Sequence, residues 1–165
     1  MTSIVLLAIL LAAAWFDWRS RKIPNFLTIP SLVAGLCVQM YEGTGWLAFT
    51  GVVGAFALTV VPVAMKGMGM GDQKLLMAVG AWSSWAELYP LFLSSIVLCM
   101  LGIVLYPRTW SRLLANMKVM AAGWTAFRQI WLPGLKQSAL SLPYAVWLFA
   151  AYVLHHYWPI AGDFL

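Results

Sequence analysis

Acidic side chains are nearly absent from this chain, which has five Asp and Glu among its 165 residues. Charged residues of both signs make up only 9% of the sequence, whereas 63% of it is hydrophobic. So little charge excludes an ordinary soluble domain, and we expect no nucleic-acid partner. A mean hydropathy of +0.86 instead indicates a polytopic membrane protein.

Cysteine is equally scarce, since Cys37 and Cys99 are the only two and each stands alone in an apolar stretch. Without a Cys-x-x-Cys pair the chain has no pattern for a zinc site or a disulfide framework, so we expect both side chains to be buried by packing. No metal and no cofactor are predicted. The first apolar stretch lacks a preceding basic segment and is followed by basic residues, so we expect no cleavable signal peptide.

Six apolar stretches separated by polar residues predict an all-α membrane protein with about six transmembrane helices in a single domain, 1–165. The predicted spans are 3–16, 26–41, 46–65, 75–85, 88–106 and 142–158. The first and fourth would reach only about 16–21 Å at 1.5 Å per residue, against a hydrocarbon core of about 30 Å. Either these two helices extend into flanking polar residues, or they lie in thinned bilayer or beside a wet cavity.

The distribution of charge predicts the topology. Six alternating spans place every Lys and Arg on one side of the membrane, and Glu42, Glu87 and Asp163 on the other. Because basic loops remain in the cytoplasm, both termini are predicted to be periplasmic. Tryptophans near the span ends, Trp82 among them, are typical of an interfacial aromatic belt.

The long basic segment before the last span is predicted to lie on the membrane rather than cross it. Within 108–132, aromatic and aliphatic residues recur at three- and four-residue steps, and most of the basic residues lie off that face. This pattern indicates an amphipathic helix bound to the anionic inner leaflet. It is either a platform for substrate or only a connector between spans.

Two of the five acids, Asp17 and Asp72, lie where apolar runs meet basic clusters. The predicted topology brings both to the cytoplasmic face, and a pair of carboxylates there suggests aspartyl chemistry. Taken singly, each aspartate also has a purely structural explanation. Asp17 could pair with the basic residues that follow it, and Asp72 could cap a helix. Because Asp72 begins a predicted helix and Asp17 ends one, the helix dipoles predict an ionised Asp72 and a protonated Asp17.

Three sequence motifs together resemble the type IV prepilin peptidases. The run that begins Asp17-Trp-Arg-Ser-Arg-Lys-Ile-Pro-Asn is similar to their first aspartate motif. Gly69-Met-Gly71-Asp72-Gln-Lys74 is similar to their Gly-x-Gly-Asp motif with its following lysine. Leu-Pro-Tyr144-Ala before the last span resembles the family's Pro-Tyr entry to its final helix. The similarity extends over most of the chain. Because this chain is shorter than the larger members of the family, it resembles the peptidases of tight-adherence (Flp) pilus systems.

The resemblance implies an inner-membrane aspartyl endopeptidase that removes the basic leader from prepilins and pseudopilins at the cytoplasmic face. Asp17 and Asp72 match the catalytic pair, one activating water while the other acts as general acid. Gly69, Gly71 and Lys74 match positions around them, and Lys74 either biases the pair or only follows the charge rule. The cytoplasmic loop with two Cys-x-x-Cys pairs found in larger members is missing, so no methyltransferase activity is expected.

Two other functions remain open from the residues alone. A non-catalytic membrane subunit, or a small transporter, could use the same acids to bind a cation or a proton. Transporters usually place such acids near the middle of the bilayer and often contain internal repeats, and neither feature is visible in this sequence. The oligomeric state is not predicted.

Overall fold

The computed structural model describes residues 2–65, 67–105 and 143–157, and these form helices with no strand. The predicted amphipathic helix at 108–132 lies outside the described residues. The described helices are α1 (Thr2–Ser20), α2 (Asn25–Tyr41), α3 (Gly45–Ala64), α4 (Met70–Trp82), α5 (Trp85–Leu105) and α8 (Tyr144–Tyr157).

The chain divides into two compact units, one of Met1–Ile96 with Pro143–Leu165 and the other of Val97–Leu142. Of the second unit only Val97–Leu105 is described, the C-terminal part of α5, and several of its apolar side chains are exposed. Every contact discussed below lies within the first unit.

The six helices coincide with the six predicted apolar stretches, but two sets of boundaries differ. The first helix extends to Ser20, about 28 Å at 1.5 Å per residue, so its predicted end at residue 16 was clipped and Asp17 lies inside its last turn. The fourth helix runs from Met70 to Trp82 rather than over 75–85. It ends there because the Ser83 hydroxyl donates back to the Val79 carbonyl oxygen at 2.9 Å.

Three described helices are long and apolar enough to cross a membrane: Thr2–Ser20, Gly45–Ala64 and Trp85–Gly102. Helix α2 is apolar but shorter, and α4 spans only about 20 Å. The described part of the chain is thus all-helical, with several membrane-spanning candidates. The count of six spans and the side on which the termini lie remain predictions.

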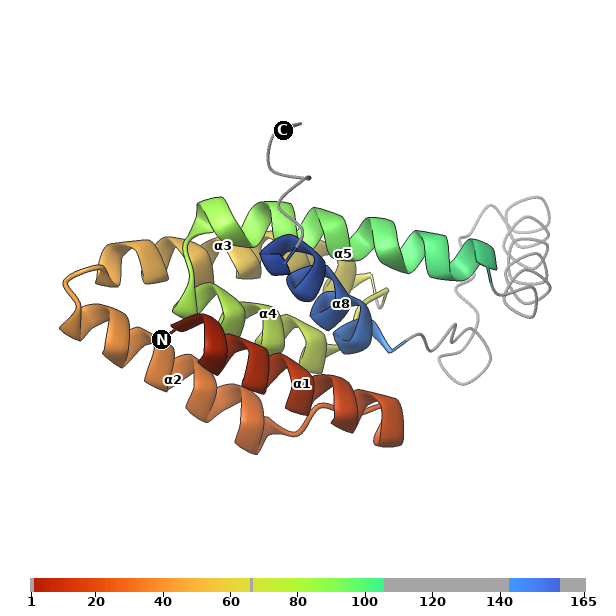
Figure 1. Cartoon of the computed structure of the whole chain (residues 1–165), viewed down its shortest axis with the longest axis horizontal. Helices are drawn as coiled ribbons and strands as arrows, with labels where there is room; N and C mark the ends of the chain where they lie inside the picture. Colours follow the sequence, from red (N-terminus) through yellow and green to blue (C-terminus); the bar gives the residue numbers. More distant parts are fainter. Residues whose placement is uncertain (1, 66, 106–142, 158–165) are drawn as a thin grey trace. The chain divides into compact units, whose positions relative to one another are not determined.

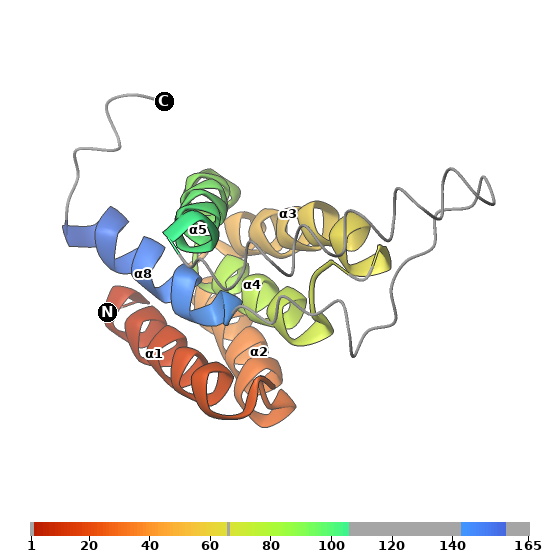
Figure 2. The ribbon, with the colours of Figure 1, turned by 90° about the vertical axis from the view of Figure 1, so that its right-hand side faces the viewer.

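Helix α4 forms the centre of the first unit, and Figure 2 shows it between α2 and α3. Most of its apolar side chains from Leu75 onward are buried, with Leu75 and Leu76 both 0% exposed. Its contact with α3 depends on two glycines, because a Cβ on Gly80 would come within 2.5 Å of the Gly51 carbonyl oxygen. Small residues at such crossings let membrane helices approach closely, which gains packing energy where no hydrophobic effect drives association.

Trp82, the last residue of α4, joins that helix to α2. Its side chain is buried, and its indole N–H donates to the Ser31 carbonyl oxygen at 2.8 Å. Gly35 leaves room for the ring, since a Cβ there would come within 2.8 Å of it. The indole therefore contributes to helix packing, and its place in an interfacial belt stays a prediction.

Helix α1 packs against α8, and the two run antiparallel (Figure 1). At one end the Tyr152 hydroxyl donates to the Ser3 carbonyl oxygen at 3.0 Å. At the other end the Ala145 amide nitrogen lies 3.1 Å from Asp17 Oδ2. The start of α1 therefore lies beside the C-terminal part of α8.

The prediction that both cysteines are buried was wrong. Cys37 is exposed on α2, and Cys99 on α5 is half-buried. Cys37 lies on the side of α2 that no described helix covers, and in a membrane protein an apolar exposed face is compatible with lipid contact.

Candidate active site

Asp17 is buried although basic residues follow it directly in the sequence. Its side chain is only 7% exposed, whereas Arg19, Arg21 and Lys22 are exposed. Arg21 adopts a left-handed conformation with φ of 54°, and its amide donates to the Asp17 carbonyl oxygen at 3.0 Å. This turn ends α1 and directs the chain away while the carboxylate remains inside the helix packing.

The partner of the Asp17 carboxylate is the beginning of α8. Asp17 Oδ2 accepts a hydrogen bond from the Ala145 amide at 3.1 Å, across 128 residues of sequence. The first amides of a helix have no partner within that helix, and together with the helix dipole they stabilise an anion. The interaction therefore favours the ionised form of Asp17.

Asp72 lies in the first turn of α4, and the two glycines before it have separate roles. A Cβ on Gly69 would come within 3.0 Å of Asp72 Oδ2, so Gly69 makes room for the carboxylate. A Cβ on Gly71 would come within 3.3 Å of Ile23 Cβ, so Gly71 makes room for the loop that follows α1. The Gly-x-Gly-Asp motif thus holds Asp72 close to its own backbone and against the segment that carries the first motif.

Asp72 is partly buried and precedes the apolar part of α4. Burial, and secondarily the negative charge of Asp17, raises its pKa from 3.8 to about 6, although a backbone hydrogen bond from Gly69 opposes the rise. The influence of Asp17 on Asp72 is the sign that the fold brings the two carboxylates together. Burial and a like charge therefore oppose the helix dipole at Asp72, and which of the two aspartates holds a shared proton stays a prediction.

Lys74 lies on the same end of α4, where its ammonium donates to Asn25 Oδ1 at 3.0 Å. Asn25 is the first residue of α2, so this bond ties the beginnings of α2 and α4 together beside the carboxylates. The contact is exposed, and its net contribution to stability is modest, on the order of 1 kcal/mol. Lys74 therefore has a structural role as well, in addition to the two roles that the sequence left open for it.

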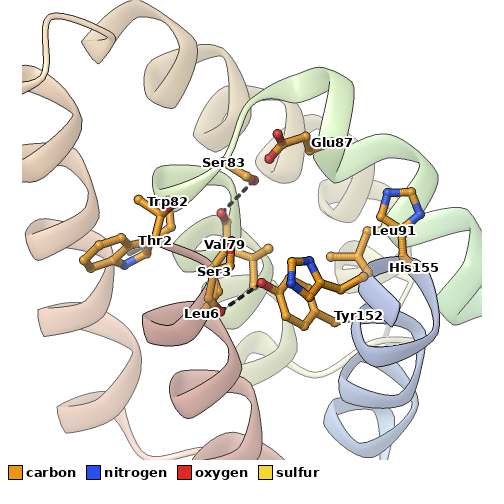
Figure 3. A pocket seen from close by; sticks show the side chains of 11 residues that line it. Thr2, Ser3, Leu6, Val79, Trp82, Ser83, Glu87, Leu91, Tyr152 and His155 are labelled. Atoms are coloured by element: carbon orange, nitrogen blue, oxygen red, sulfur yellow. Dashed lines mark hydrogen bonds between the residues drawn. The ribbon is translucent and has the colours of Figure 1, made fainter. Parts of the chain in front are cut away.

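A cavity of about 300 Å³ lies at the other end of the same helices (Figure 3). Its lining includes Ser3 of α1, Ser83 after α4, and Tyr152 and His155 of α8. Along α1, Ser3 and Asp17 are about 20 Å apart at 1.5 Å per residue. The cavity is therefore separate from the carboxylate pair, and His155, which is exposed, lies far from Asp17 as the sequence predicted.

No metal site is visible in the described ranges, where no three His, Cys, Asp or Glu side chains gather to hold an ion. The site consists of two carboxylates, two glycines and backbone amides. Sequence reasoning selected Asp17, Asp72, Gly69, Gly71 and Lys74. It missed the roles of the Ala145 amide and of Asn25, although both belong to motifs that it quoted.

Residues 4–105 match the type IV leader peptidase family, a range that includes both aspartates. The chain belongs to this family. Similar curated proteins include the prepilin leader peptidase/N-methyltransferase of Burkholderia pseudomallei, 39% identical over 93 residues, which are 50% of this chain and 30% of that protein. The protein of the same name from Aeromonas hydrophila is 33% identical over 116 residues, covering 62% of this chain and 39% of the relative.

A third relative with that name, from Pseudomonas aeruginosa, is 33% identical over 107 residues, or 58% of this chain and 37% of the relative. The matches thus span between 30% and 39% of the length of these relatives. No solved structure matches the chain.

Proposed function

We propose that this chain is a membrane aspartyl endopeptidase that removes the basic leader from prepilins or pseudopilins. The observation that carries the proposal is the carboxylate pair itself, in which burial, and secondarily the charge of Asp17, raises the pKa of Asp72 to about 6. Family membership and the names of the relatives support a leader peptidase. They favour it over a transporter or a non-catalytic subunit that would use the same acids for an ion.

The two carboxylates divide the roles of general base and general acid. The ionised one takes a proton from water as the water oxygen attacks the scissile carbonyl carbon, and the protonated one donates its proton to the carbonyl oxygen. When the tetrahedral intermediate collapses, the first carboxyl group returns its proton to the leaving amine and the second recovers one from the new carboxyl group. A pKa of about 6 lets Asp72 gain or lose a proton near neutral pH, as either role requires.

The proposal places the site at the cytoplasmic face of the bacterial inner membrane, beside an anionic leaflet. The exposed residues Arg19, Arg21 and Lys22 follow Asp17 directly, and basic residues favour the cytoplasmic side. The antiparallel pairing of α1 and α8, with Ser3 beside Tyr152, supports termini on one common side, the periplasm. The proposal also includes six membrane spans and prepilin or pseudopilin substrates. It further states that the protein hydrolyses the leader peptide bond without transferring a methyl group.

The test is leader removal from a co-expressed prepilin, followed as a shift in the substrate's size. Asp17→Asn and Asp72→Asn should each abolish cleavage while the protein persists in the membrane, and the double variant should be no worse than either single one. Glu87→Gln, in the first turn of α5 and beside the cavity at the far end of α4, is the matched control and should cleave normally. Normal cleavage by either aspartate variant would overturn the aspartyl mechanism.

A further inference from the structure

The first turn of α8 is held in place by a hydroxyl pair that the function described so far does not use. We propose that Tyr144 and Ser95 are positioning residues, whose hydrogen bond fixes the Ala145 amide against the Asp17 carboxylate. The inference rests on the proposed function and assigns a catalytic purpose to a contact whose tyrosine lies outside the residues that match the family, 4–105.

The direction of the hydrogen bond between the two hydroxyls follows from a third group. Ser95 Oγ lies 2.7 Å from the Phe92 carbonyl oxygen, and this contact takes the only hydrogen of the serine. The Tyr144 hydroxyl, 2.9 Å from Ser95 Oγ, is therefore the donor in that pair. Ser95 is 0% exposed, so water does not compete for its oxygen. A buried and directed bond of this kind ties the start of α8 to α5.

The residue that follows Tyr144 carries the amide that reaches Asp17. The Ala145 N–H belongs to the peptide bond that follows Tyr144, so a displacement of Tyr144 displaces this donor as well. The next amide, of Val146, already donates to the Pro143 carbonyl oxygen at 3.1 Å. Ala145 is 0% exposed, which leaves no room for water to replace its hydrogen bond to the carboxylate. Asp17 therefore depends on the position of this one turn.

Catalysis is more sensitive to such a displacement than folding is. A reacting group that moves by about 1 Å can lose much of its rate advantage, whereas one hydrogen bond contributes little to net stability. If Tyr144 only stabilised the fold, removing its hydroxyl would act like removing any other interhelical hydroxyl on α8.

Helix α8 offers a matched control for this distinction. Tyr152 lies about 12 Å along the same helix at 1.5 Å per residue, and its hydroxyl also donates to a neighbouring helix, at 3.0 Å to the Ser3 carbonyl oxygen. Tyr144→Phe and Tyr152→Phe remove the same chemical group from opposite ends of one helix. Only the first change acts at the end that contacts Asp17.

The experiment measures steady-state cleavage of a prepilin by the purified full chain in detergent, together with the melting temperature. Tyr144→Phe and Ser95→Ala should each lower kcat between a few-fold and about tenfold, with KM changed less than about twofold. Tyr152→Phe should leave kcat within about twofold of the parent, while its melting temperature falls as much as that of Tyr144→Phe. The double variant Tyr144→Phe/Ser95→Ala should be no slower than the slower single variant, since both remove one bond.

Equal kcat values for Tyr144→Phe and Tyr152→Phe would overturn the inference, as would additive losses in the double variant. A rise in KM with kcat unchanged would overturn it too. If Tyr144→Phe does not fold, Ser95→Ala removes the same bond from the other side and is judged by the same criteria. Asp17→Asn in the same assay separates the two proposals: if it cleaves, the proposed function fails, whereas an inactive Asp17→Asn with a normal Tyr144→Phe refutes only the positioning role.

Discussion

Asp72 is expected to destabilise the fold at neutral pH, so its replacement by a neutral isostere should stabilise the protein while abolishing activity. Its pKa is raised from 3.8 to about 6, so the folded state binds the proton more tightly than the unfolded state does. Above pH 6 the folded chain must hold a partly buried anion. As the pH falls below about 6 this cost is relieved, and it is fully removed below about pH 4.

The size of the effect follows from the shift. A change of about two pKa units corresponds to roughly 3 kcal/mol at 1.36 kcal/mol per unit, and partial exposure of Asp72 reduces this to roughly 1–2 kcal/mol. Asp72→Asn removes the charge but keeps the size of the side chain. At pH 8 the variant should therefore be more stable than the parent by about that amount, and the difference should disappear near pH 4. Asp17→Asn should remove part of the effect, because the charge of Asp17 contributes to the shift.

The assay is thermal or denaturant unfolding of the parent and Asp72→Asn in one detergent between pH 4 and pH 8. The difference between the two proteins isolates Asp72 from the other titrating groups. Glu87→Gln, which removes another carboxylate of the first unit, is measured beside them as the control. A variant that is less stable than the parent at pH 8, or a difference that does not change with pH, would refute the reasoning.

Two further predictions concern the glycine motif and the topology. Gly71→Ala should lower the cleavage rate by roughly tenfold, because its Cβ would push against the isoleucine of the loop after α1 at 3.3 Å and shift Asp17 relative to Asp72. Gly67→Ala, whose Cβ has no heavy atom nearer than 3.5 Å, should cleave normally, and equal rates for the two variants would contradict the role assigned to the motif. In a chain without its native cysteines, a cysteine at Glu42 or Glu87 should react with an impermeant thiol reagent from the periplasm, and one at Ser20 should not. The opposite labelling pattern would place the carboxylates on the wrong side for prepilin leaders.

The sequence alone determined where the helices lie and which acids matter. Long apolar runs form helices in either lipid or a protein core, since backbone groups must be satisfied within the segment, and all six predicted stretches are helical. Asp17 and Asp72 were identifiable because an acid beside apolar segments is costly. Boundaries were less certain, because the polar residues at the end of α1 continue the helix and a serine hydroxyl ends α4.

Only the tertiary structure decided which groups surround the two carboxylates. The Ala145 amide reaches Asp17 because α1 and α8 pack antiparallel, a contact that depends on interhelical packing and not on any local pattern. Likewise, the burial of Asp72 and the charge of Asp17 raise the pKa of Asp72 against the effect of the helix dipole, because desolvation and a like charge act through space. Local sequence sets backbone hydrogen bonding and therefore the helices, whereas the protonation of a buried carboxylate depends on every element packed around it.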